Sequence, residues 1–203
     1  MSNILITIPT RGMIHPGTIE AVYNMELGDN CCRFKVVDGY DIATARNKAA
    51  KMALDAEADY LLMIDDDVIP PEDALVNMLE NPCLVKLGFY AHRNKNNLYT
   101  GITSICKMGQ HNYTHQYTSD ELRRMCYKGE YMVRIHGGGM GFALIDTKVF
   151  RHIKPPWFKW EQSKYVHLSE DLYFCELCNM NGAQIYTDTR VNCGHVFRYV
   201  QNV

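Results

Sequence analysis

Short, continuous apolar runs alternate with segments of helical spacing in the first part of the chain. The runs NILITIP (residues 3–9), CRFKVVD (32–38) and YLLMI (60–64) have the length and composition of buried strands. Between them, residues 16–27 begin with a proline, and residues 41–58 are rich in alanine with Asp41 as N-cap, which predicts two helices. Strand, helix, strand, helix, strand is the beginning of a doubly wound α/β sheet.

The pattern weakens in the middle of the chain and returns towards its end. Residues 92–130 are polar, aromatic and rich in asparagine, with one short helix predicted at 119–126. The remaining predicted elements are a short helix over 70–80, a strand over 84–90, strand-like alternation around glycines over 131–146, a helix over 169–182, and a last strand with a tail over 184–200. We therefore predict an α/β fold with a Rossmann-like, mostly parallel central sheet flanked by helices, in a single domain over residues 1–203.

Composition and charge exclude several classes of partner. The 203 residues carry a net charge of -2 with a pI near 6.4, so the chain as a whole gives no reason to expect a nucleic acid as partner. The first residues lack a basic segment before their apolar run, and no run reaches the length of a transmembrane helix. We expect a cytoplasmic protein without a transmembrane segment, in which the eight cysteines are reduced thiols and form no disulfides. The sequence gives no indication of the oligomeric state.

Three consecutive aspartates, Asp65 to Asp67, directly follow the third predicted strand. In open α/β sheets ligands bind beyond the carboxyl ends of the strands. Strand alternation predicts that Asp65 and Asp67 face one side and Asp66 the other. Two convergent carboxylates suit a hard divalent cation that also holds substrate phosphates, whereas the simpler alternative is a solvated acidic turn before a proline pair. The same rim should also contain the residues that end the first two strands: Pro9, Thr10, Arg11 and Asp38.

Several motifs together resemble a known enzyme family. The stretch YLLMIDDDVIPP, preceded by ATARNKAAKMAL, is similar to the core of GT-A fold, family 2-like nucleotide-sugar glycosyltransferases. Downstream, GGGMGFALIDTKVF, PPWF, SEDLYFCELCNMNGAQIYTD and a final GH resemble the acceptor-side loop, the Glu-Asp helix and the late metal-binding histidine of that family. The resemblance covers nearly the whole chain except residues 92–130. It implies a nucleotide-binding half of about residues 1–90 and an acceptor-side half of about 91–203.

The resemblance also implies an activity and the residues that perform it. The activity is metal-dependent transfer of a sugar from a nucleoside-diphosphate sugar, a UDP- or GDP-sugar, to a hydroxyl of an acceptor that is a glycan, a protein or a small molecule. Mn²⁺ is favoured over Mg²⁺ because one implied ligand is an imidazole. For catalysis the resemblance implies Asp171 as general base with Glu170 beside it, and for the metal it implies Asp65, Asp67 and His195. The implied donor site consists of Pro9, Thr10, Arg11, Asp38, Arg46, Asp65 and Asp66. The implied acceptor site consists of Gly138, Gly139, Trp157 and Trp160.

Each of these residues also has a simpler interpretation. Arg46 could be an arginine on a helix surface, while its neighbour Asn47 is expected to brace the adjacent loop. Glu170 and Asp171 follow Ser169, a good N-cap, and acidic residues in a first helical turn suit the helix dipole without any catalytic role. The glycines could form a tight turn or bulge, and the tryptophans could belong to the core. His195 could be an ordinary core or surface histidine.

Three other functions remain open from the sequence. A structural zinc site could use Cys175, Cys178, Cys193 and His195, although the first two are one helical turn apart at positions that thiols readily fill in a core. A sugar nucleotidyltransferase could share the sheet and the metal, but the loop IPTRGMIHPG has no lysine and its glycines are separated. The third possibility is an inactive protein that only binds a nucleotide sugar.

Overall fold

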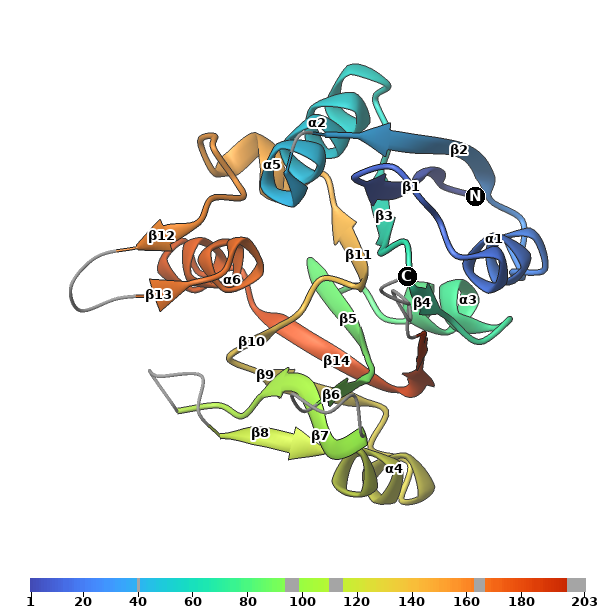
Figure 1. Cartoon of the computed structure of the whole chain (residues 1–203), viewed down its shortest axis with the longest axis vertical. Coiled ribbons are helices and arrows are strands. Elements are labelled where there is room, and N and C mark those ends of the chain that lie inside the picture. Colours follow the sequence, from blue (N-terminus) through green and yellow to red (C-terminus); the bar gives the residue numbers. More distant parts are fainter. Residues whose placement is uncertain (40, 94–98, 110–114, 163–166, 197–203) are drawn as a thin grey trace, which may run out of the picture.

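A seven-stranded sheet forms the centre of the molecule (Figure 1). The computed structural model describes residues 1–39, 41–93, 99–109, 115–162 and 167–196. Strands β2, β1, β3, β5 and β14 run in one direction, and β11 and β9 run in the other, which confirms the mostly parallel α/β sheet. The order across the sheet is β2 (Cys31–Asp38), β1 (Asn3–Thr10), β3 (Tyr60–Ile64), β11 (Phe142–Asp146), β5 (Val85–Phe89), β14 (Ile185–Asn192) and β9 (Met132–Ile135).

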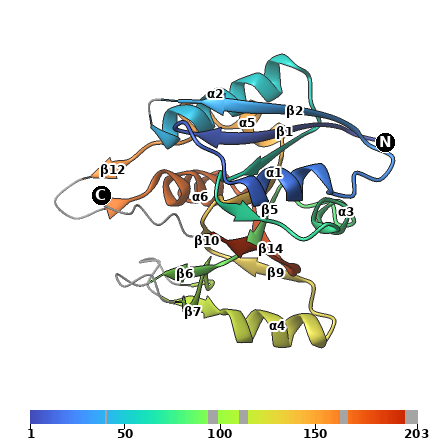
Figure 2. The ribbon, with the colours of Figure 1, turned by 45° about the vertical axis from the view of Figure 1, so that its right-hand side comes forward.

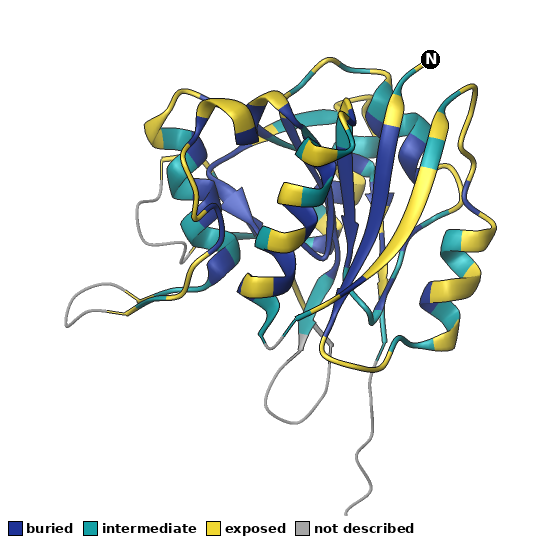
Figure 3. Ribbon diagram, turned by 90° about the horizontal axis from the view of Figure 1, so that it is seen from above, coloured by how far each residue is buried: buried dark blue, intermediate teal, exposed yellow. Residues whose placement is uncertain are grey.

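Two apolar clusters fill the two faces of this sheet. Successive residues of β3 alternate between them: Leu61 and Met63 join one cluster, and Leu62 and Ile64 join the other. Side chains of α2, α5 and α6 complete the first cluster. Side chains of α3 complete the second cluster, and α1 also packs against it. Figure 3 shows buried residues concentrated in the central strands. The helices are α1 (Pro16–Tyr23), α2 (Ile42–Asp55), α3 (Ala74–Leu79), α4 (Ser119–Tyr127), α5 (Lys148–His152) and α6 (Glu170–Met180).

The segment without a clear sequence pattern folds into a smaller sheet below the large one (Figure 2). This sheet has the order β10 (Gly137–Gly138), β7 (Tyr99–Cys106) and β6 (Ala91–Arg93), and β8 (Gln116–Thr118) pairs with β7. Two further pairs are short: β12 (Glu161–Gln162) with β13 (His167–Leu168), and β4 (Val68–Ile69) with β15 (Gly194–His195). The last pair joins the end of the described chain to the segment that follows the three aspartates.

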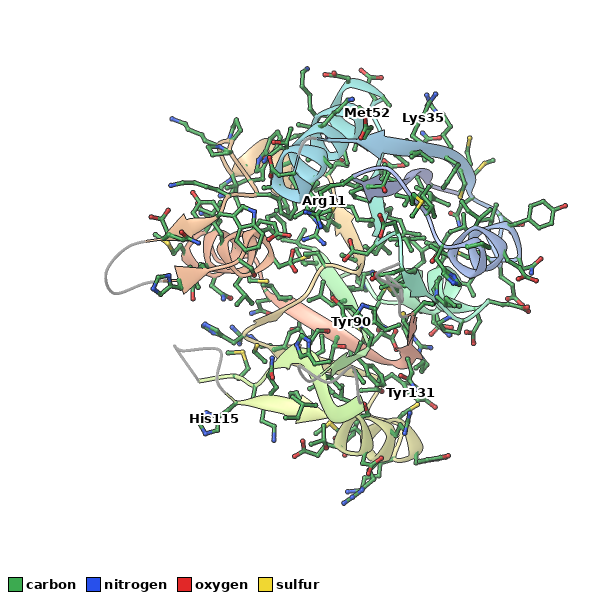
Figure 4. The ribbon with its side chains drawn as sticks, viewed as in Figure 1. Arg11, Lys35, Met52, Tyr90, His115 and Tyr131 are labelled. Atoms are coloured by element: carbon green, nitrogen blue, oxygen red, sulfur yellow. The ribbon has the colours of Figure 1, made fainter. Side chains whose placement is uncertain are left out.

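Gly139 and Gly141 are required by close packing against Tyr90. A Cβ atom at Gly139 would lie 2.3 Å from the Tyr90 hydroxyl, and one at Gly141 would lie 2.7 Å from the Tyr90 ring. Tyr90 itself lies between the two sheets, where burial raises the pKa of its hydroxyl (Figure 4). Close packing against Tyr90 therefore explains Gly139 and Gly141, and the acceptor role of Gly138 and Gly139 stays a prediction.

Local capping follows the sequence predictions closely. The Asp41 carboxylate accepts a hydrogen bond from the backbone N–H of Thr44 at 3.1 Å, which starts α2, and Ser169 caps α6 through the N–H of Leu172. Asn47 braces the neighbouring loop as predicted, because its amide donates to the carbonyl of Phe158 and accepts from that residue's N–H. None of the helices within the described residues has both the length and the apolar character needed to span a bilayer.

Candidate active site

The site begins at the carboxyl ends of β1 and β3, which are adjacent and parallel. The Thr10 hydroxyl at the end of β1 donates to the Asp66 carboxylate at 2.6 Å. The backbone carbonyl of Asp66 accepts from the N–H of His15, the N-cap of α1, at 2.8 Å. Asp66 thus ties the loop after β1 and the start of α1 to the loop after β3, which fixes the rim of the sheet. Its role in donor binding stays a prediction.

A cleft of about 430 Å³ opens above this rim, a volume within the usual range for small-molecule sites. It brings together residues from both ends of the chain, and Figure 4 shows Arg11 in the space framed by α2, α6 and the large sheet. Most of the predicted donor and catalytic residues lie in it. The lining residues are Pro9, Thr10, Arg11, Ile42, Arg46, Asp65, Asp66, Asp67, Trp160, Glu170 and Asp171.

Arg46 lies at the floor of the cleft with 1% of its surface exposed, so the helix-surface interpretation is wrong. One terminal nitrogen lies 2.8 and 3.1 Å from the two Asp65 oxygens, and the other lies 2.9 Å from Glu170 and also contacts Asp171. Burial lowers the pKa of Arg46, but Asp65 and Glu170 raise it more, so the guanidinium stays charged. We call Arg46 with these three acids the carboxylate clamp.

The carboxylate clamp joins three parts of the chain that are distant in sequence. Arg46 comes from α2, Asp65 from the end of β3, and Glu170 and Asp171 from the first turn of α6. One guanidinium faces three carboxylates, so the clamp keeps an excess of negative charge when all three are ionised. Because both terminal nitrogens of Arg46 already hold carboxylates, direct contact between Arg46 and a nucleotide or diphosphate stays a prediction. The role of Asp65 as a metal ligand also stays a prediction.

Asp67 and His195 lie together at the edge of the cleft, and we call them the metal pair. The pairing of β15 with β4 sets His195 opposite Val68, and His195 Nε2 lies 3.6 Å from Asp67 Oδ1. Nδ1 of the same ring lies 3.3 Å from the carbonyl oxygen of Ala91. Since a carbonyl oxygen can only accept, this contact favours a proton on Nδ1, and Nε2 is the ring nitrogen that faces Asp67.

The metal pair fits a divalent cation in geometry and in chemistry. Two metal–ligand bonds of about 2.1 Å span at most about 4.2 Å, so atoms separated by 3.6 Å can both bind one ion. A backbone carbonyl that accepts from the second ring nitrogen is the usual support of a metal-binding histidine. Within the described ranges no group of three or more histidine, cysteine or acidic side chains is arranged for a metal. Further ligands would therefore come from phosphate oxygens and water.

Other predicted residues lie outside the cleft. Asp38 ends β2 beside Thr10 in the sheet register, but it does not line the cleft, and its donor role stays a prediction. Trp157 is 6% exposed and packs against Phe150 in the core, so its face is not available to a sugar. Gly138 is buried in β10. Only Trp160, half exposed at the cleft, has the exposure that a sugar platform needs.

The zinc alternative is not favoured by the arrangement of the thiols. Cys175 and Cys178 belong to the cluster on one face of the sheet, whereas Cys193 belongs to the cluster on the other face. Burial raises the pKa of Cys178 to about 12 and that of Cys175 and Cys193 further, and buried thiols of this kind behave as apolar core residues.

A second, smaller cavity of about 110 Å³ adjoins the cleft at Asp171, and we call it the side cavity. The sequence did not predict it, because half of its lining residues come from the segment 92–130, where strands of mixed polarity give no readable period. Burial, and to a lesser degree His195, lowers the pKa of His92 in its wall, so this ring is neutral at pH 7. The lining residues are His92, Ser104, Cys106, Gln116, Gly139, Ser169, Asp171 and Leu172.

A larger hollow of about 670 Å³ shares with the site, among the described residues, His195. Its other wall includes the exposed side chains of Arg123 and Arg124 on α4. It contains none of the three consecutive aspartates and no residue of the carboxylate clamp, so we assign the chemistry to the smaller cleft.

Comparison with known proteins defines the fold. The computed structure is similar to the crystal structure of A197 from STIV, with a TM-score of 0.64 and 19% identity over 97% of this chain and 86% of that one. It is also similar to GalNAc-T7 crystallised with UDP, GalNAc and Mn²⁺, with a TM-score of 0.65 and 9% identity over 98% of this chain and 44% of that one. The chain has a GT-A-like fold. It spans less than half of the GalNAc-T7 chain. No family model and no curated protein sequence matches it.

Proposed function

We propose that the protein is a metal-dependent glycosyltransferase that uses a nucleoside-diphosphate sugar. The observation that carries the proposal is the metal pair: a carboxylate that follows β3 and an imidazole from the end of the described chain converge at 3.6 Å beside the cleft. The GT-A-like fold supports it, since the similar GalNAc-T7 structure contains UDP and Mn²⁺. The nucleotidyltransferase and zinc alternatives have no comparable support.

The donor would lie in the cleft with its diphosphate between the metal pair and Arg11. A bound Mn²⁺ or Mg²⁺ would neutralise the charge that develops on the departing diphosphate. Arg11 is exposed at the loop after β1 and lines the cleft, so its guanidinium can bind phosphate oxygens. Asp65, held by two hydrogen bonds from Arg46, keeps a fixed orientation in which it can accept bonds from donor hydroxyls.

Asp171 would act as the general base for the acceptor hydroxyl. It is the residue at which the cleft and the side cavity meet, so it can face a donor in one and an acceptor in the other. Arg46 contacts it, and its place in the first turn of α6 keeps it oriented. Glu170 is buried with 4% exposure and would position Arg46.

A donor screen tests the proposal. We expect release of free nucleoside diphosphate from at least one sugar in a panel of UDP- and GDP-sugars with Mn²⁺, and loss of that release when EDTA is added. Nucleotide detection by liquid chromatography measures both rates. Binding of donors without any turnover would support the inactive binder instead, and equal turnover in EDTA would remove the metal from the proposal.

Asp171→Asn is expected to separate donor binding from transfer. The amide keeps the size of the side chain but cannot accept the acceptor's proton, so transfer should fall by about 10²–10⁴-fold while donor affinity stays within about twofold. Calorimetry with the donor and a transfer assay measure the two effects. Normal transfer by this variant would exclude Asp171 as the base.

A further inference from the structure

The side cavity has properties that the donor cleft does not share. It is about a quarter of the cleft in volume, and its polar groups come from four elements: β6, β7, β8 and the start of α6. Its described lining contains no lysine, arginine or glutamate, and its acidic group is Asp171, which also lines the cleft. It therefore suits an uncharged, hydrogen-bonding group and not a diphosphate.

Ser104 is the clearest sign that this cavity takes a ligand. The residue is 3% exposed, and its Oγ interacts with the buried Tyr90 hydroxyl but makes no hydrogen bond of standard geometry to any described residue. The backbone on either side is fixed, because the N–H of Ser104 donates to Tyr90 and its carbonyl accepts from Gly139. A hydroxyl can donate one hydrogen bond and accept two, so one held rigidly at a cavity wall beside Tyr90 still has capacity that a ligand can complete.

The other polar groups surround the same small space. Gln116 Nε2 lies 3.3 Å from His92 Nε2, so these two side chains brace each other across β6 and β8. The Ser169 hydroxyl already accepts from the N–H of Leu172 and can still donate. The cavity has a volume of about 110 Å³, which is room for a few hydroxyl-sized groups. Because several donors and acceptors surround this volume, it matches a ligand with two neighbouring hydroxyls better than a ligand with one.

We infer that the side cavity is the acceptor subsite and that it binds a neutral carbohydrate through adjacent hydroxyls, with Ser104 and Gln116 as the residues that select it. This inference rests on the proposed function for its link to transfer, but the binding of the sugar can be tested separately. An acceptor hydroxyl seated there would lie beside Asp171, at the junction with the cleft. A serine or threonine side chain of a peptide would offer one hydroxyl and would leave part of the polar wall without partners.

The test compares wild type with Ser104→Ala and Gln116→Leu, and with Ser119→Ala as a matched control. Ser119 is another buried serine, 9% exposed, which lies in α4 and does not line the side cavity. The probes are methyl glycosides of neutral hexoses, a methyl glucuronide and a serine-containing peptide. Saturation-transfer NMR measures their binding, and a transfer assay with the active donor measures product.

We expect the neutral glycosides to bind wild type and Ser119→Ala with similar affinity. Their binding should weaken about tenfold in Ser104→Ala. Donor hydrolysis should stay within about twofold of wild type in every variant. Equal glycoside binding by wild type and both cavity variants would overturn the inference, as would a preference for the glucuronide or the peptide. Donor hydrolysis without glycoside binding overturns the acceptor subsite but not the glycosyltransferase. Glycoside binding that depends on Ser104, without hydrolysis of any donor, supports the cavity and contradicts the proposed function.

Discussion

Arg46→Ala is expected to destabilise the protein more than any other single substitution in the cleft. It removes the buried cation that holds Asp65, Glu170 and Asp171, and leaves three carboxylates close together in a partly buried site. Loss of one partner from a buried ionic group typically costs about 3–5 kcal/mol, a large part of the stability of an ordinary domain. For a chain of this size we expect the melting temperature to fall by about 10 °C or more. Differential scanning calorimetry measures the change.

Two further variants separate the role of the guanidinium from that of charge alone. Lys51→Ala on the same helix breaks an exposed pair with Asp55 and should change stability by less than about 1 kcal/mol. Arg46→Lys keeps the charge but cannot reach three carboxylates with a planar fork, so it should fold and still turn over donor poorly. Wild-type stability in Arg46→Ala would show that the carboxylate clamp does not hold the site together.

Asp67→Ala is expected to abolish metal-dependent donor binding and to leave the fold intact. Asp67 is partly exposed at the end of β3, and the substitution removes one of the two side chains that can bind the cation. Donor affinity in Mn²⁺ should fall by about 100-fold or more and should become the same as in EDTA. Isothermal titration calorimetry with the donor in the two conditions measures this.

The matched control for Asp67 is Asp73→Ala. Asp73 precedes α3, its side chain makes no capping hydrogen bond, and it does not line the cleft. Donor binding by this variant should remain metal-dependent with an affinity close to that of wild type. If Asp67→Ala binds the donor with undiminished affinity in Mn²⁺, the metal is not held by Asp67.

The sequence predicted the elements whose periodicity is strong. The run YLLMI becomes β3 with the predicted bounds, and Asp41 and Ser169 cap α2 and α6, because these signals depend on local interactions. The antiparallel insertion of β11 between β3 and β5 was not predicted, since the direction of a strand depends on connections that its own residues do not encode. The small sheet around β7 was missed for a related reason: polar residues face its cavity, so the strand pattern is interrupted.

The candidate site shows the same division between local and distant information. The rim at Thr10 and Asp66 follows from the rule for strand ends. The approach of His195 to Asp67 was proposed from a family resemblance, and the two-residue pairing of β15 with β4 explains it physically. The burial of Arg46 was not foreseen, because its three carboxylates come from segments that only the folded chain brings together.

Anomalous diffraction from crystals grown with Mn²⁺ and UDP tests the central claim most directly. The account predicts a manganese peak bonded to both Asp67 and His195 at about 2.0–2.3 Å, with the diphosphate of UDP completing its coordination. A manganese peak with UDP at a place where His195 cannot reach the ion, or UDP bound in the cleft without a metal, would contradict it.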